Sequence, residues 1–119
     1  MLIIIPSRDD NTIAVEFNGQ ATKEDAEKLD RYVKEKFPGD LKFNVLAIMH
    51  DVDGSSFRGA VQGMKFDAKR WSQFQKFAVV TDKKWIQTVA AIGNYLPGIE
   101  AKQFDKDQIE QAWQWIKES

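Results

Sequence analysis

The stretch His50–Gly59, which reads HDVDGSSFRG, gathers side chains that could do chemistry. It contains the one histidine of the sequence, followed closely by two aspartates and two serines. Histidine, aspartate and serine are the parts of a hydrolytic triad, aspartates ligate cations, and a turn that leads into a helix can hold a phosphate. The spacing of these residues decides between the three chemistries.

None of these three sites has the residues and the spacing that its chemistry requires. A triad is usually assembled from distant segments, and no G-x-S-x-G turn exposes a serine here. A calcium loop that starts at Asp51 would need glutamate at its twelfth position, where Gln62 stands, and glycine at its sixth, whereas Gly54 is the fourth residue. A phosphate loop needs more glycines and a lysine. We therefore expect no enzymatic activity, no metal and no cofactor.

The simplest interpretation of the stretch is a turn between a strand and a helix. A strand ends at His50, Asp53 and Gly54 turn the chain, and Ser55 or Ser56 caps the next helix. In open α/β sheets, ligands bind at the loops that follow the carboxyl ends of strands, and a helix N-terminus there favours an anion. We expect the stretch to border a site rather than to carry its chemistry.

The first half of the chain supplies the elements that must position this turn. Residues 1–5 and 12–17 predict two strands, joined by the polar turn SRDDN into a hairpin. Thr22 is a good N-cap for a helix that Pro38-Gly39 ends. Residues 41–50 predict a strand whose apolar second half is typical of the middle of a parallel sheet. The spacing of the helix predicts one buried stripe, formed by Ala26, Leu29, Val33 and Phe37.

The second half alternates helices and strands. Apolar residues from Phe57 to Trp71 predict a helix, residues 76–82 a strand, and Asp82 the cap of a third helix that ends at Pro97-Gly98. Residues 99–105 predict the last strand, and a terminal helix follows that buries Ile109, Ala112, Trp113 and Ile116. The order β-β-α-β-α-β-α-β-α predicts a single α/β domain over residues 1–119. Its sheet is mixed but mostly parallel, with an N-terminal β-hairpin and right-handed crossovers.

The composition fits a globular domain. Hydrophobic residues make up 43% and charged residues 29% of the 119 residues. Cysteine is absent, which excludes disulfides and thiolate sites and agrees with a reducing cytoplasm. The opening MLIII is too short for a signal peptide, and no apolar run approaches the ~18 residues of a membrane span. We expect a cytoplasmic protein.

The charge is unevenly distributed. Six cations and two anions between Lys65 and Lys84 give this segment a net charge of +4, although the whole chain carries −1. A basic segment of this kind can meet an anionic surface. The pI of about 5.8 and the absence of a recognition motif argue against nucleic acid as the partner.

The segment FRGAVQGMKFDAKRWSQFQKFAVVTDKKWIQTV resembles the SpoIIAA-like (STAS) family of small stand-alone bacterial proteins. Its pattern is F-x-G, then K-F, then a phenylalanine before A-V-V-x-D-x-x-W, and the later LPG and A-x-x-W also fit. Many members carry an acidic residue where Gly63 stands and histidine where Arg70 stands. The matching positions here are Phe57, Gly59, Lys65, Phe66, Phe74, Ala78, Val79, Val80, Asp82, Trp85, Ala112 and Trp115.

This resemblance implies a SpoIIAA/STAS-like fold and two functions. The stand-alone members are similar to the lipid-carrying CRAL-TRIO domains, which implies an apolar cleft and membrane association. Anti-sigma-factor antagonists of this fold are switched by phosphorylation of a serine at the start of the second helix. Ser55 and Ser56 lie near that place, but the D-S-[ST]-G sequence expected around it is absent.

The first functional hypothesis is a module that binds a lipid-like apolar ligand or associates peripherally with a membrane. The second and third predicted helices have more apolar surface than one sheet face can cover, and they carry cations next to tryptophans. The apolar set is Phe57, Met64, Phe66, Trp71, Trp85, Val89 and Leu96, and the basic set is Lys65, Lys69, Arg70, Lys83 and Lys84.

The second hypothesis is a regulatory domain that binds a protein partner or a second copy of itself. Phosphorylation of Ser55 or Ser56 would be its switch, because phosphate at a helix N-terminus is locally favourable. Asp51 and Asp53 would oppose that phosphate, and Arg58 is the one arginine close to it in sequence.

Overall fold

A computed structural model of the chain describes residues 1–19, 22–52, 72–82, 85 and 98–118. The second predicted helix lies outside the described residues, as do the stretch from Asp53 to Gly59 and the third predicted helix apart from Trp85. The elements that are described follow the predicted order along the chain.

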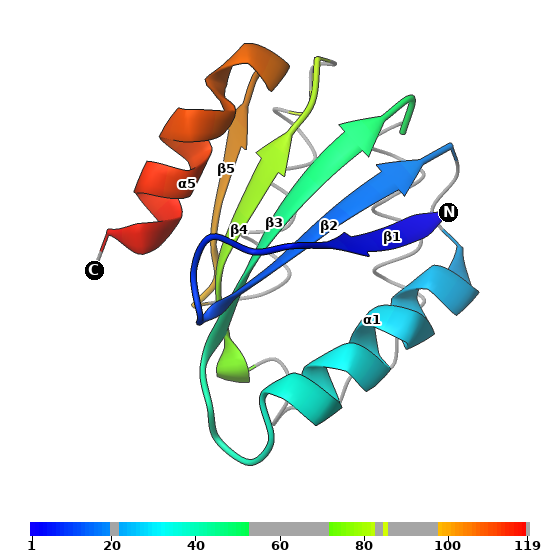
Figure 1. The fold of residues 1–119 in the computed structure, drawn as a ribbon, viewed down its shortest axis with the longest axis vertical. Helices are drawn as coiled ribbons and strands as arrows, with labels where there is room; N and C mark the ends of the chain where they lie inside the picture. Colours follow the sequence, from blue (N-terminus) through cyan, green and yellow to red (C-terminus); the bar gives the residue numbers. More distant parts are fainter. Residues whose placement is uncertain (20–21, 53–71, 83–84, 86–97, 119) are drawn as a thin grey trace.

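Five strands form one mixed sheet in the order β1-β2-β3-β4-β5 (Figure 1). β1 and β2 pair antiparallel, which confirms the predicted hairpin, and the other three pairings are parallel. β3 lies in the middle, and its residues are buried up to the last one, as its apolar sequence predicts. The strands are β1 (Leu2–Ile5), β2 (Thr12–Asn18), β3 (Phe43–His50), β4 (Phe74–Val80) and β5 (Glu100–Phe104).

The two faces of the sheet carry separate cores, because successive side chains of a strand point to opposite sides. Val45 and Ala47 of β3 belong to the core on the side of helix α1 (Lys23–Lys36), while Leu46 and Ile48 belong to the core on the side of helix α5 (Ile109–Lys117). The sheet is thus covered on both faces, as expected for parallel strands.

Local sequence features explain where helix α1 begins and ends. The Thr22 hydroxyl accepts a hydrogen bond from the Asp25 N–H at 3.2 Å, and the Asp25 carboxylate accepts one from the Thr22 N–H at 3.1 Å. This capping box confirms the predicted start of the helix. The predicted stripe is buried, with Leu29 partly so, and Gly39 takes the positive φ of 69° at which the chain turns away.

Helix α5 is attached to the sheet at both ends. A 3₁₀ turn, η1 (Lys106–Gln108), leads into it, and Ala112, Trp113 and Ile116 are buried as predicted. Near its start, Arg8 makes two hydrogen bonds of 2.8 Å to the Glu110 carboxylate. The loop between β1 and β2 is therefore joined to the first turn of α5.

Side chains of α1 occupy part of the free edge of β1. The Leu2 N–H donates to Asp25 Oδ1 at 3.0 Å, and Lys28 Nζ donates to the Leu2 carbonyl at 3.0 Å. An edge strand with unpaired backbone groups invites pairing with another chain, so these bonds protect that position. Among the helices of the described part, none has the length and apolar character to cross a bilayer.

Candidate functional site at the carboxyl edge of the sheet

Four polar side chains lie on one face of the sheet, at the edge where the parallel strands end. Side chains two positions apart along a strand share a face. His50, Asp82 and Lys106 each stand two positions beyond a member of one row of paired residues across the sheet. His50 is the last residue of β3, whereas Asp82 and Lys106 follow the ends of β4 and β5. The row consists of Glu16, Ile48, Val80 and Phe104.

Backbone hydrogen bonds hold these strand ends together. The Gly19 N–H donates to the His50 carbonyl at 3.1 Å, which ties the end of β2 to that of β3. The Thr81 N–H donates to the Phe104 carbonyl at 3.0 Å, which places Asp82 beside the start of η1. Side chains anchored on these residues therefore start from a rigid base.

The four side chains form a continuous polar chain, here called the carboxyl-edge cluster (Glu16, His50, Asp82 and Lys106). Lys106 Nζ lies 3.0 Å from His50 Nδ1 and 4.0 Å from Asp82 Oδ2. On the other side of the ring, His50 Nε2 lies 3.8 Å from Glu16 Oε2. The cluster thus links four neighbouring strands near their carboxyl ends, in the order Glu16, His50, Lys106 and Asp82.

These contacts favour one tautomer of the neutral His50 ring. An ammonium group has donors only, so a hydrogen bond between Lys106 and His50 Nδ1 favours the tautomer of the neutral ring that carries its proton on Nε2, on the side of Glu16. The side chains of Glu16, His50 and Lys106 are about one-third exposed, and that of Asp82 is 67% exposed. At such exposure each ion pair contributes only about 0.2–1 kcal/mol to stability.

The chain leaves the cluster through an unusual backbone conformation. Asp51 has a φ of 56°, in the left-handed region, and is the one residue other than glycine with positive φ in the described part of the chain. Aspartate is among the residues that tolerate this region. Val52 then turns back into the core, with 1% of its surface exposed. The predicted strand end at His50 is therefore confirmed, and the chain bends sharply there.

Trp85 is the one member of the predicted apolar set that the structure describes. Its side chain is 1% exposed and belongs to the core on the α1 side of the sheet. Its backbone N–H donates to Gln103 Oε1 at 2.9 Å, so the residue is tied to β5. The structure therefore places Trp85 in the interior rather than in a surface belt of aromatic residues.

The other predicted site residues lie outside the described part of the chain, and their roles stay predictions. They are the apolar residues Phe57, Met64, Phe66, Trp71, Val89 and Leu96, the basic residues Lys65, Lys69, Arg70, Lys83 and Lys84, and the serines Ser55 and Ser56.

Sequence reasoning missed Glu16 and Lys106. Glu16 is one polar residue within an alternating strand, and Lys106 opens a terminal helix, so neither carries a motif. The strand order could have indicated their position. Lys106 follows β5, His50 ends β3, and the carboxyl ends of parallel strands lie at the same edge of the sheet. Within the described residues, no group of three or more potential metal ligands is present.

Comparison with known proteins gives a family and a fold. The family described as SpoIIAA-like matches residues 12–117. A similar solved structure is that of an uncharacterised protein of the DUF3478 family with a SpoIIAA-like fold from Shewanella loihica PV-4. The two chains are 18% identical and superpose with a TM-score of 0.67 over 98% of this chain and 92% of the other. No curated protein matches this chain.

Proposed function

Because this chain belongs to the SpoIIAA-like family, we propose that it is a regulatory module without catalytic activity that binds a protein partner through the carboxyl edge of its sheet. The observation that carries the proposal is the carboxyl-edge cluster, which joins the ends of four strands. Ligands of open α/β sheets bind at this edge.

The energetics of the cluster favour recognition over stability as its role. Exposed ion pairs contribute little to folding, whereas charges arranged at a fixed geometry give a partner both orientation and specificity. Lys106 contacts His50 and Asp82 at once, so its ammonium is held in place before a partner arrives. Side chains that are already ordered lose less conformational entropy on binding.

Regulation of this edge would come from the segment that follows it. Ser55 and Ser56 come three and four positions after Val52, where the chain leaves the cluster. A phosphoryl group there would add about −1.5 to −2 charge five or six positions after His50 in the sequence.

Site-specific photo-crosslinking in the native cell tests the proposal. Asn18 is exposed and pairs with His50 in the sheet, so a photoreactive residue there reports on the cluster without replacing a member of it. Gln114, exposed on α5, is the matched control. We expect one discrete protein adduct from position 18 and none of that mass from position 114. Absence of an adduct from position 18, or the same adducts from both positions, would contradict the proposal.

A second candidate is the apolar-ligand or membrane module, and its support is the sequence pattern of residues 57–71. Glycines at positions 59 and 63 of a helix cost about 1 kcal/mol each unless close approach to another group offsets that cost. Native mass spectrometry of gently purified protein, followed by solvent extraction, tests for a bound apolar molecule. Co-sedimentation with vesicles of phosphatidylglycerol and phosphatidylcholine, compared between wild type and Lys69→Glu/Arg70→Glu, tests for a membrane.

A further inference from the structure

The contact between Lys106 and His50 can exist in only one protonation state of the imidazole ring. Lys106 Nζ lies 3.0 Å from His50 Nδ1, and the neutral ring can accept a hydrogen bond at that nitrogen. A protonated imidazole carries a proton on both nitrogens and has no acceptor left. Protonation would therefore place two cations at hydrogen-bond distance and break the contact, because like charges repel.

The carboxyl-edge cluster already holds a partner for each of these two cations. Glu16 Oε2 lies 3.8 Å from His50 Nε2, on the other side of the ring from Lys106, and Asp82 Oδ2 lies 4.0 Å from Lys106 Nζ. Both separations are slightly too long for a hydrogen bond. A small rotation of either side chain would thus replace the contact between Lys106 and His50 by two ion pairs.

The charged groups around the ring come from every neighbouring element of the described part of the chain. β2 contributes Glu16, η1 contributes Lys106, and Asp82, which follows β4, reaches the ring only through Lys106. Asp51 comes next on the same segment and is exposed. The N-terminal ammonium of the chain lies against the capping carboxylate of α1 instead. A proton on the ring therefore adds its charge between one carboxylate and one ammonium.

The rearrangement needs no change in the backbone. The strands end at one edge of the sheet (Figure 1), and hydrogen bonds from Gly19 to the His50 carbonyl and from Thr81 to the Phe104 carbonyl hold these ends together. The side chains of His50 and Lys106 are each 36% exposed, so water reaches both and the core packing does not restrain them.

We propose that the carboxyl-edge cluster is a proton-controlled switch for partner binding, an inference that rests on the proposed function of this edge. A proton from solvent on His50 pairs the ring with Glu16 and transfers Lys106 to Asp82, so the ammonium that the partner recognises leaves its place. Histidine is the side chain that ordinarily changes its charge between about pH 5 and 8. The partner should therefore bind near neutral pH and dissociate in mild acid.

Nuclear Overhauser contacts in the full chain test the switch without any partner. At about pH 8 we expect a contact between the ε-methylene of Lys106 and the His50 ring, and at about pH 5 its loss together with a stronger contact to the β-methylene of Asp82. Both changes should follow the ¹⁵N shifts of the His50 ring as the pH is lowered. A contact between Lys106 and His50 that persists when the ring is protonated would overturn the proposal.

His50→Gln is the matched variant, because the glutamine amide can still accept from Lys106 but takes up no proton in this pH range. The contact between Lys106 and Asp82 should then be the same at about pH 8 and about pH 5. A contact that still strengthens in acid in this variant would assign the change to another group and would also overturn the proposal.

The crosslink from position 18 tests the control of the partner, with purified chain added to cell lysate at about pH 7.5 and about pH 5.5. The yield should fall about tenfold at the lower pH, and it should be equal at both in His50→Gln. Equal yields from the otherwise unchanged chain would overturn the switch and leave the proposed function standing. Absence of an adduct at both pH values would instead contradict the proposed function, and the Overhauser contacts would still decide whether Lys106 moves.

Discussion

Nζ of Lys106 lies 3.0 Å from Nδ1 of His50, although 56 positions separate the two residues in the sequence. The contact exists because β3 and β5 flank β4 in parallel, so that the residues at and just after their carboxyl ends share one edge. The imidazole accepts this hydrogen bond in its neutral form, since the ammonium has no acceptor. The contact thereby links the ends of β3 and β5 at the proposed partner site.

The Lys106 contact predicts the tautomer of His50. Long-range ¹H–¹⁵N spectra, recorded where the imidazole is neutral, should show the proton on Nε2 and none on Nδ1. Lys106→Met removes the donor and should raise the share of the Nδ1–H tautomer. A wild-type ring that carries its proton mainly on Nδ1 would be incompatible with this contact.

Gln73 joins the end of α1 to the start of β4 and should be a stability-determining residue. It is 1% exposed, and its Nε2 donates to the carbonyls of Phe37 at 3.0 Å and Leu41 at 2.8 Å. Gln73→Met keeps the volume but leaves both carbonyls without this donor, so the free energy of unfolding should fall by about 2–4 kcal/mol. Urea denaturation measures this. Gln75→Met, on the exposed side of β4, should change it by less than about 0.5 kcal/mol.

The capping carboxylate of α1 makes stability depend on acid pH. Burial on its own would raise the pKa of Asp25, but hydrogen bonds from Thr22, the N-terminal ammonium and the Leu2 N–H together lower that pKa below its ordinary value of 3.8. The ionised carboxylate therefore contributes stability above the unfolded-state pKa. That contribution is lost as the pH falls through the lower pKa of the folded state.

Asp25→Asn isolates this contribution. Near neutral pH the variant should lose about 1 kcal/mol of unfolding free energy, the usual cost of a weakened helix cap. The difference from wild type should shrink as the pH falls from about 4 through the lower pKa of the folded state, where the wild-type carboxyl becomes protonated as well. Glu27→Gln, on the exposed side of the same helix, serves as control. A difference that stays constant down to the acid transition would refute the linkage.

Lys76 holds the end of α5 against the sheet. Its Nζ donates to the carbonyl of Trp115 at 2.9 Å and to that of Glu118, and it lies 5.1 Å from the centroid of the Trp115 ring. Lys76→Met should therefore speed amide hydrogen exchange in the last turn of α5 and cost about 1–2 kcal/mol. Lys117→Met removes an exposed cation from the same turn and should have a smaller effect on both.

The elements that were predicted from sequence are those with local signals. Thr22 starts α1 because its own side chain and that of Asp25 make the cap, and both stand within one turn of sequence. The buried strands follow from apolar runs, and the position of β3 inside the sheet follows from the apolar run Val45–Met49. Such features need no knowledge of distant contacts.

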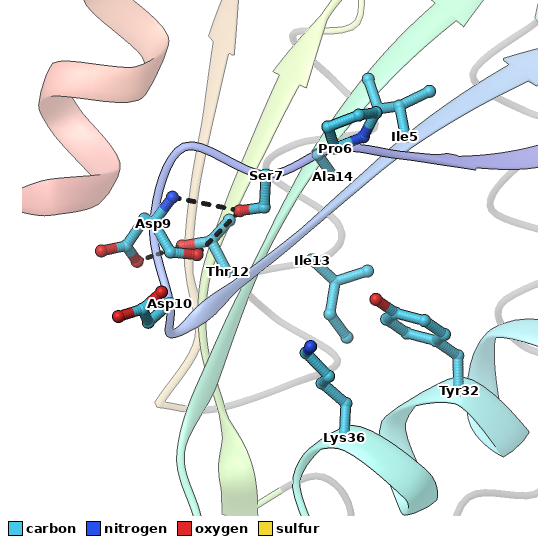
Figure 2. A pocket seen from close by; sticks show the side chains of 10 residues that line it. All are labelled: Ile5, Pro6, Ser7, Asp9, Asp10, Thr12, Ile13, Ala14, Tyr32 and Lys36. Carbon is cyan, nitrogen blue, oxygen red and sulfur yellow. Dashed lines mark hydrogen bonds between the residues drawn. The ribbon is translucent and has the colours of Figure 1, made fainter.

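The carboxyl-edge cluster could not be predicted in this way. Glu16 and Lys106 become neighbours of His50 only through the register of three parallel pairings, which no local pattern specifies. Likewise, Asp10 and Lys36 both line a hollow beside the start of β2 (Figure 2), whereas the sequence marks both as ordinary surface charges.

The yield of the position-18 crosslink in Lys106→Met, relative to Lys23→Met, tests the central claim most directly. Both variants lose one exposed or partly exposed cation, but only Lys106 belongs to the carboxyl-edge cluster. If the cluster recognises the partner, the yield should fall about tenfold or more in Lys106→Met, as expected for loss of a fixed charge contact, and stay at the wild-type value in Lys23→Met. Equal yields from the two variants would contradict the account.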